Sequence, residues 1–139
     1  SLNDLNNSLS ELNLKNIELN YIEWHPSMDQ EVIKSDIVII PYINDNRRIV
    51  KSQNRITDSM SMGRFVICSE IDFSKEFKKY CYVGNLGEGL AWVYNNRENA
   101  IKKAGLGKNY VDSKFNIQKI SEYWMNLIND IFEKFNKNL

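Results

Sequence analysis

The chain has 139 residues, of which 42% are hydrophobic, and its 18 basic side chains balance 18 acidic ones. This length is typical of one domain, and the hydrophobic fraction is enough for a buried core, which excludes a disordered chain. The lack of net positive charge argues against nucleic acid as a partner. Two cysteines and one histidine are too few for a disulfide framework, a cysteine zinc site or a multi-histidine metal site.

The first part of the chain alternates helical and extended patterns. Leucines at helical spacing predict a helix over residues 2–12, and alternating side chains predict a strand over 16–23. Pro26 suits the first turn of a short helix that runs to about Ile33. The continuous apolar run at 36–42 is typical of a strand covered on both faces in a parallel sheet.

The middle of the chain repeats this alternation. A helix is expected over residues 52–62, followed by a buried strand at 65–68. A short helix over 73–79 and a third apolar strand at 80–83 come next. No stretch reaches the roughly 18 apolar residues of a membrane span.

The last part of the chain is expected to be helical. Residues 86–104 form one predicted helix, which Gly105 and Gly107 are expected to break. Apolar residues at helical spacing then predict a long C-terminal helix over 116–136. Its aromatic stripe is expected to be a packing surface, against this sheet or against another domain.

The alternation of strands and helices favours an α/β three-layer domain with a mostly parallel sheet. In open sheets of this kind, ligands bind beyond the carboxyl ends of the strands. The loops after Tyr42, Cys68 and Val83 are therefore the expected ligand site.

The helix expected over 52–62 has two unlike faces. Ile56 and Met60 lie on one side of the helical wheel, which must pack on the sheet. A second set of side chains falls nearly opposite, within an arc of roughly 100°, and so points away from the local core. That set consists of Lys51, Asn54, Arg55, Asp58 and Met62.

The first turn of this helix has the chemistry of a phosphate site. Ser52 is the expected N-cap, which leaves the next amides free to meet an anion beside Lys51 and Arg55. Asp58, one turn deeper, can accept hydrogen bonds from a ribose diol, and Gly63 lets the chain turn closely into the next strand. The alternative is an ordinary surface ion pair between Arg55 and Asp58, worth about 0.2–0.5 kcal/mol.

The segment DSMSMGRFVIC, residues 58–68, resembles the donor-binding segment of GT-B-type glycosyltransferases. In retaining members of that family, two acids separated by seven residues precede small residues, a glycine and a β-strand. Asp58 stands five residues before Gly63, where the family places the acid that binds the nucleotide ribose. The run KSDIVIIPY is similar to the strand before the family's donor loop, and VDSKFNIQKISEYWMNLI is similar to its tryptophan-bearing C-terminal helix.

The first half of the donor segment departs from the family pattern. Val50 stands eight residues before Asp58, where the family has the acid that contacts the transferred sugar. The run KSQNR, residues 51–55, is similar instead to a K-S-x-N-R variant of bacterial members, in which basic residues meet the diphosphate. The resemblance therefore implies nucleotide binding more directly than sugar transfer.

The resemblance also implies an architecture and roles for individual residues. Residues 1–139 would be one Rossmann-like domain, the C-terminal half of a longer enzyme whose N-terminal acceptor domain is missing. The substrate would be a nucleotide-diphosphate sugar, transferred to a glycan, lipid-linked or protein acceptor without any metal or other cofactor. The fragment alone would be inactive, and the whole enzyme would work in the cytoplasm or at the membrane periphery. Lys51 and Arg55 would stabilise the leaving diphosphate as catalytic residues, and Arg48, Ser52, Asn54, Asp58 and Gly63 would bind the substrate.

Two other functions remain open. A degenerate domain of this fold would bind a nucleotide or a protein partner without transfer, and Val50 favours that reading. A flavodoxin-like or receiver-like domain needs clustered acids at strand ends or a flavin loop, and neither is evident. His25 and Cys68 are expected to be structural, Glu70 is expected to be a solvated loop acid, and the glycine-rich run at 84–89 fits a helix start better than a phosphate loop.

Overall fold

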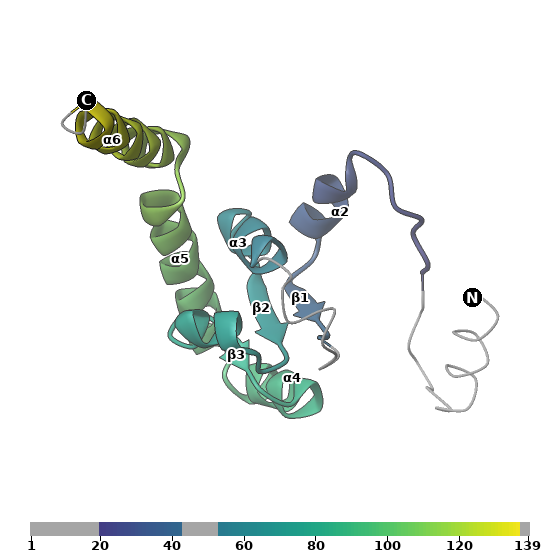
Figure 1. Cartoon of the computed structure of the whole chain (residues 1–139). Coiled ribbons are helices and arrows are strands. Elements are labelled where there is room, and N and C mark those ends of the chain that lie inside the picture. Colours follow the sequence, from purple (N-terminus) through teal and green to yellow (C-terminus); the bar gives the residue numbers. More distant parts are fainter. Residues whose placement is uncertain (1–19, 43–52, 137–139) are drawn as a thin grey trace.

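The computed structural model of the chain describes residues 20–42 and 53–136. Its strands form one parallel sheet in the order β1-β2-β3, with β1 at Ile37–Ile40, β2 at Phe65–Cys68 and β3 at Tyr82–Val83. The helices are α2 (Met28–Lys34), α3 (Asn54–Ser61), the 3₁₀ helix η1 (Asp72–Phe77), α4 (Leu86–Asn95), α5 (Arg97–Lys114) and α6 (Ile117–Asn136). The described part is thus a mixed α/β fold with a small parallel sheet, and the predicted class is confirmed at that level (Figure 1).

Strand β2 is the centre of the sheet. Its register runs from Phe65 opposite Ile37 to Cys68 opposite Ile40, and all four of its residues are buried. The expectation that the run at 36–42 is also covered on both faces is wrong, because β1 lies at the edge of the described sheet and Ile39 is 43% exposed. Burial on both faces therefore holds for the central strand only.

The two faces of the sheet carry separate core clusters. On one face, Ile56 and Met60 of α3 pack with Val66, Cys68 and Phe77. On the other face, α4 and the start of α5 pack against β2 through Val93, Ala100 and Ala104, with Phe65 and Ile67 as their strand partners. Figure 1 shows α3 and α4 on opposite sides of the strands, so helices cover both faces.

Helix α5 corrects a prediction about glycine. Gly105 and Gly107 do not break the helix, which continues to Lys114, and the break falls earlier, at Asn96. Gly107 is buried where a Cβ atom would lie 3.2 Å from Cβ of Tyr80 and 3.5 Å from Sδ of Met60. The glycine lets α5 approach its neighbours closely, and this packing outweighs its low helix propensity of about 1 kcal/mol.

Several predicted elements are shorter than expected, and one is absent. The helix predicted from Pro26 is α2, the strand at 80–83 is the two-residue β3, and the helix at 73–79 is η1. Residues 20–23 are irregular, so the predicted strand over 16–23 is wrong for its described part. The rest of that strand and the helix expected over 2–12 lie outside the described residues.

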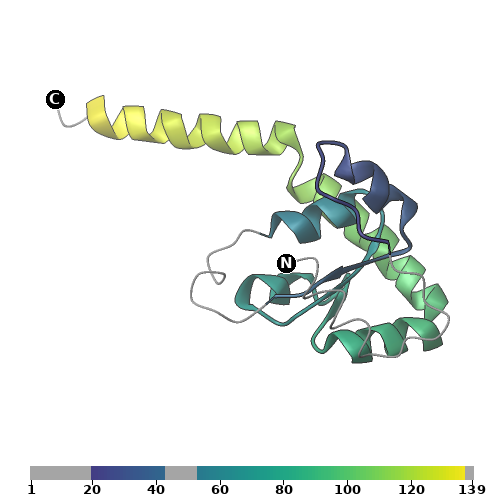
Figure 2. The same ribbon diagram turned by 90° about the vertical axis from the view of Figure 1, so that its right-hand side faces the viewer.

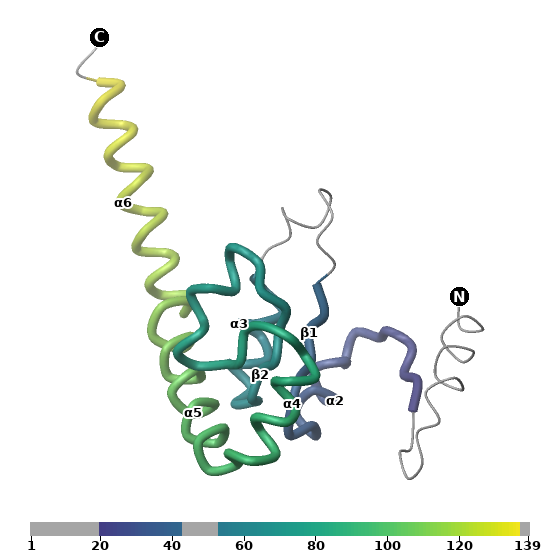
Figure 3. Tube along the Cα trace, turned by 90° about the horizontal axis from the view of Figure 1, so that it is seen from below, coloured from purple at the N-terminus to yellow at the C-terminus, as the bar shows by residue number. Residues whose placement is uncertain are grey.

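Helix α6 confirms the predicted C-terminal helix but not a packing role against the sheet. It has 20 residues, none of them buried. Figures 2 and 3 show it extending away from the sheet and the helices around it. Its two unlike faces are therefore both open to solvent in this chain. No helix in the described ranges is both long and apolar enough to cross a bilayer.

Candidate functional site

The carboxyl ends of the three strands are tied together by hydrogen bonds. The amide of Tyr42 donates to Oγ of Ser69 at 3.1 Å, and the amide of Ser69 donates to the carbonyl of Ile40 at 3.3 Å. The amide of Gly84 donates to the carbonyl of Cys68 at 2.9 Å. The segments that follow the three strands therefore meet at one end of the sheet, as the sequence predicted.

Helix α3 presents the polar face that the sequence predicted. Ile56 and Met60 are 0% and 1% exposed, while Asn54, Arg55 and Asp58 are exposed. The intervening Ser59 is buried and donates its hydroxyl to the carbonyl of Arg55 at 2.7 Å, so it needs no partner outside the helix. Burial of one side fixes the rotation of α3 and holds the polar side toward solvent.

The start of α3 differs from the prediction. The helix begins at Asn54, and Gln53 occupies the N-cap position without a capping side-chain hydrogen bond. The carbonyl of Gln53 accepts from the amides of Ile56 and Thr57 at 2.9 and 3.1 Å. The predicted cap, Ser52, is therefore one residue too early. Ser52 itself, together with Arg48, Val50 and Lys51, lies outside the described residues.

Arg55 and Asp58 do not form the ion pair that was the alternative to a binding surface. Partial burial raises the pKa of Asp58 above its ordinary value, and among the described residues no cation acts against this shift. A salt bridge with Arg55 would lower that pKa instead. The cationic Arg55 and the anionic Asp58 thus lie on the same exposed face of α3 without pairing with each other.

Gly63 confirms its predicted role in the turn after α3. Its φ of 73° is in the left-handed region, its amide donates to the carbonyl of Met60 at 2.8 Å, and the amide of Arg64 donates to the carbonyl of Ser59 at 3.0 Å. This is the Schellman motif, in which glycine is favoured. Gly63 follows Arg55 by eight residues, about 12 Å along the axis. The structure therefore does not bring Gly63 together with Asn54 and Arg55.

Tyr42 lies at this end of the sheet, as expected for the residue before one of the predicted ligand loops. Its hydroxyl is buried and has no hydrogen-bond partner among the described residues. Its ring meets Phe73 edge-on at 5.2 Å between centroids. Burial and the nearby Cys68 raise its pKa, and the charge of Arg55 acts in the opposite direction. Tyr42 is thus within electrostatic reach of the polar face of α3.

The acids that follow β2 are already paired at the surface. Glu70 accepts from Nζ of Lys78 at 2.9 Å, and Asp72 accepts from Nζ of Lys75 at 2.9 Å. These hydrogen bonds lower the pKa of each carboxyl. Both acids are exposed, as expected for Glu70 in the loop, and Asp72 is the first residue of η1.

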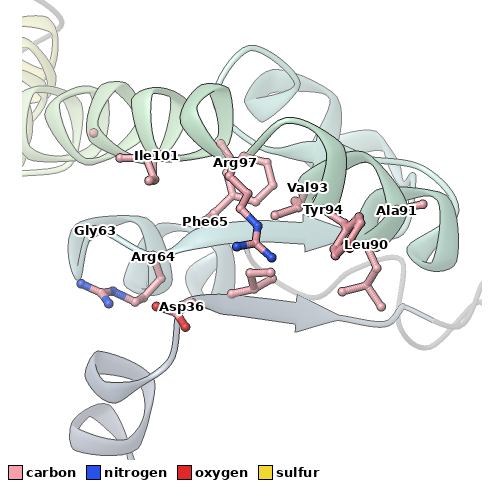
Figure 4. Close-up of a pocket in the computed structure, with 14 residues that line it drawn as sticks. Asp36, Gly63, Arg64, Phe65, Leu90, Ala91, Val93, Tyr94, Arg97 and Ile101 are labelled. Atoms are coloured by element: carbon pink, nitrogen blue, oxygen red, sulfur yellow. The ribbon is translucent and has the colours of Figure 1, made fainter.

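A groove lies along one face of the sheet, and one predicted site residue, Gly63, is part of its lining. Its volume is about 1010 Å³, and it opens between β1 and β2 on one side and the α4–α5 helices on the other (Figure 4). Its walls include Ile37, Leu90 and Ile101, with the guanidinium of Arg97 projecting between them. Arg64 at its rim donates to the carbonyls of Met62 at 3.0 Å and Ser35 at 2.9 Å, so it connects α2 to the turn after α3.

The groove has only an indirect signal in the sequence. Three residues of the helix predicted over 86–104 line it, and of these only Val93 is buried, while Leu90 and Tyr94 are 43% and 73% exposed. The guanidinium carbon of Arg97 lies 5.4 Å from the ring centroid of Tyr94. An aromatic residue three positions before an arginine was the only local sign of this contact.

The remaining sequence predictions concern structural residues. Cys68 is fully buried in the core, as expected. Asn85 caps α4 by accepting from the amide of Glu88 at 3.1 Å, which confirms that the glycine-rich run begins a helix. The carbonyl of His25 accepts from the amide of Met28 at 3.0 Å, at the start of α2. Over residues 20–42 and 53–136, no three His, Cys, Asp or Glu side chains are grouped to hold a metal ion.

Comparison with known proteins adds no relative. No protein-family model matches the chain, and neither the curated proteins nor the solved structures include a match.

Proposed function

We propose that this chain is the donor-binding half of a GT-B-type glycosyltransferase and that it binds a nucleotide-diphosphate sugar at the carboxyl end of its sheet. The observation that supports this proposal is the exposed face of α3, on which Arg55 and Asp58 lie unpaired with each other. The guanidinium of Arg55 can bind a phosphate, and the carboxylate of Asp58 can accept hydrogen bonds from a ribose diol. In this reading the parallel sheet with helices on both faces is part of a Rossmann-like domain.

The order of groups along α3 matches the order of groups in a nucleotide diphosphate. Arg55 lies in the first turn, where the helix dipole also favours an anion, and Asp58 lies one turn further along. The diphosphate would therefore lie toward the first turn and the ribose toward the middle of the helix. Asn54, exposed at the first position of α3, would donate its amide to the same phosphates.

The reaction would be sugar transfer to an acceptor held by another part of the enzyme. In that reaction Arg55, with Lys51, would stabilise the negative charge that develops on the leaving diphosphate. Ser52 and Arg48 would add phosphate contacts. This part of the proposal rests on the family resemblance, and only the enzyme with its acceptor domain can test it, by assay against donor and acceptor sugars.

Nucleotide binding can be tested on the chain itself by calorimetric titration with UDP, GDP and their sugars. We expect saturable binding of at least one of them. Arg55→Ala and Asp58→Ala should each weaken it at least tenfold, about 1.4 kcal/mol. Arg97→Ala is the matched control, because it also removes an exposed cation but lies in the groove. No binding by the folded chain, or binding lost only in the Arg97 variant, would overturn the proposal.

A further inference from the structure

The groove between β1, β2 and the α4–α5 helices is of the size that holds a small molecule. Ligand pockets are typically clefts of about 300–1,000 Å³ with mostly apolar walls and a few well-placed polar groups. This groove has a volume of about 1010 Å³. Among the described residues that line it, three are charged: Asp36, Arg64 and Arg97. The chemistry of the ligand is therefore set by few groups.

Small residues of α5 leave room for an apolar channel within the groove. Ala100 and Ala104 are 4% and 6% exposed, so the helix lies close to the sheet without large side chains between them. A Cβ atom added at Gly105 would meet nothing within 4 Å, so there is open space there. From Arg97 to Gly105 the channel follows α5 for about 12 Å along the helix axis. Its lining residues are Ile37, Phe65, Ala100, Ile101, Ala104 and Gly105.

Arg97 supplies a cation where this channel begins. Its guanidinium projects between the walls of the groove (Figure 4), and the guanidinium carbon lies 5.4 Å from the ring centroid of Tyr94. Within residues 20–42 and 53–136, Arg97 makes no hydrogen bond and no ion pair. Its N–H groups are therefore open to a ligand, and a guanidinium binds a carboxylate through two parallel hydrogen bonds. Apolar walls strengthen this attraction, because they lower the local dielectric constant.

The other two charged residues of the groove compete little for an anion. Asp36 and Arg64 directly precede Ile37 and Phe65, which are paired in the sheet, so the two opposite charges are neighbours. Arg64 also donates to the carbonyls of Met62 and Ser35. Figure 4 shows both side chains apart from Arg97. An anionic group is thus favoured at Arg97 rather than at the amino ends of the strands.

We propose that the groove binds a single-chain carboxylate amphiphile, with its carboxylate on Arg97 and its hydrocarbon chain in the apolar channel. The two ends of such a molecule match the cation and the apolar walls, and the chain gains free energy when it leaves water. A chain of about ten carbons fits the length of the channel, because carbon–carbon bonds are about 1.5 Å long and the chain is a zigzag. Decanoate is therefore the probe of choice.

A further protein domain is a poorer match for the same groove. A domain packed over it would bury Arg97, which is costly unless the domain also brings an acid to the same point. A small carboxylate reaches the guanidinium from within the groove and leaves the rest of this exposed side chain in water. The proposed site is separate from the polar face of α3 and does not rest on nucleotide binding there.

Calorimetric titration of the whole chain with decanoate, below the concentration at which decanoate forms micelles, tests the proposal. We expect saturable binding at one site. Decanol has the same chain without the charge and should bind at least tenfold more weakly. Octanoate lacks two methylene groups and should bind about tenfold more weakly, because each buried methylene contributes about fourfold.

Variants at the two ends of the channel locate the ligand. Arg97→Gln should weaken decanoate at least tenfold and leave the affinity for decanol unchanged. Arg55→Gln is its control, since it removes an exposed cation outside the groove. Gly105→Leu should fill the open end and weaken decanoate more than octanoate. Asn109→Leu adds the same side chain to an exposed position of α5 outside the groove and should change neither affinity. Circular dichroism checks that each variant is folded.

Two-dimensional NMR with added decanoate distinguishes the groove from the other exposed apolar surface of the chain, helix α6. We expect the largest amide shifts on Arg97, Ala100 and Ile101. Shifts that cluster on α6 around Trp124 would show adsorption to that helix and overturn the proposal. So would equal affinities for decanoate and decanol, or no saturable binding by the folded chain, which would leave the groove to another part of the protein.

Discussion

The two faces of the sheet are packed in different ways, although Gly107 also allows a close approach to Met60 on the α3 side. The face under α3 is filled by large side chains, of which Ile56, Met60 and Phe77 are fully buried. The face under α4 and α5 is closed by small residues, and Gly89 and Ala104 let the helix backbones lie directly on the strands. The first arrangement is sensitive to lost volume and the second to added volume.

This difference in packing bears on two surfaces: the polar surface of α3 and the groove beside α4 and α5. Large buried side chains hold α3 in one rotation, which directs Arg55 and Asp58 outward together. On the other face, the small residues bring α4 and α5 down onto β2, and the groove lies where Ile37 and Phe65 border those helices. Packing by large side chains thus accompanies the polar face of α3, and packing by small residues accompanies the groove.

The largest effect should follow from lost volume on the α3 face. Met60→Ala removes a side chain that is 1% exposed, and we expect the free energy of unfolding to fall by about 2–5 kcal/mol. Met60→Leu keeps most of the volume and should cost less than about 1.5 kcal/mol. Urea denaturation of both variants measures the difference. Equal losses in the two would contradict a face that is sensitive to volume.

On the face covered by α4 and α5, an added methyl group should lower the free energy of unfolding. A Cβ atom at Gly89 would lie 2.6 Å from Cγ2 of Ile67 and 2.8 Å from Cδ1 of Tyr82. Gly89→Ala should therefore lower the free energy of unfolding by about 1–3 kcal/mol. Gly105→Ala is the control, because nothing lies within 4 Å of its added methyl group and the site is helical. That variant should gain roughly 0.5–1 kcal/mol, and a loss there would show that α5 does not tolerate the methyl group.

A pH-dependent contribution should come from the surface contact between η1 and α5. Glu76 accepts hydrogen bonds from Lys114 and Tyr110, and these lower its pKa below the ordinary value. A lowered carboxyl pKa stabilises the fold above the unfolded pKa, and this stabilisation is lost as the pH falls through the folded pKa. Glu76→Gln should cost about 1 kcal/mol or less at pH 7, because the pair is exposed.

Thermal unfolding across a pH series checks the prediction for Glu76. The gap between the natural chain and the Gln variant should be constant at neutral pH and shrink below about pH 4, near the ordinary pKa of a glutamate. A gap that persists in acid would mean that lost packing, rather than the charge of the carboxylate, is responsible.

The smallest expected change in stability is a gain rather than a loss. It comes from Asp58 in the proposed binding site. Burial raises the pKa of Asp58, so the ionised carboxylate costs the fold stability as the pH rises above its unfolded pKa. Asp58→Asn should raise the melting temperature at pH 7 by about 1–2 °C and weaken nucleotide binding. At pH 3 the two proteins should melt together. A lower melting temperature at pH 7 would show that Asp58 has a structural role instead.

Local patterns in the sequence predicted most of the described elements. The strand at 65–68, the helices near 26–33 and 52–62, and the C-terminal helix all appear near their predicted positions, from an apolar run, from Pro26 and from helical spacing. The two glycines of α5 were misread, because helix propensity is a local property while the need for a close approach to Tyr80 depends on the tertiary fold. Local patterns also do not predict whether α6 packs on this sheet, because that depends on the tertiary fold.

The candidate site was predictable to a similar degree. The opposed faces of α3 and the turn at Gly63 follow from helical periodicity and from the freedom of glycine at positive φ. The missing ion pair between Arg55 and Asp58 was not predictable, because spacing allows the pair without requiring it. The burial of the Tyr42 hydroxyl and the groove beside Arg97 arise from segments distant in sequence, so the spacing of Tyr94 and Arg97 is the one local sign of either.

We propose above that a nucleotide binds on the face of α3 at the carboxyl end of the sheet. The most direct test is to follow the backbone amides by two-dimensional NMR while UDP, GDP or one of their sugars is added. The largest shifts should fall on Asn54, Arg55 and Asp58, and on Ser69 at the carboxyl end of β2. Shifts that instead cluster on Leu90, Arg97 and Ile101 around the groove, or no shifts with any of these ligands, would contradict it.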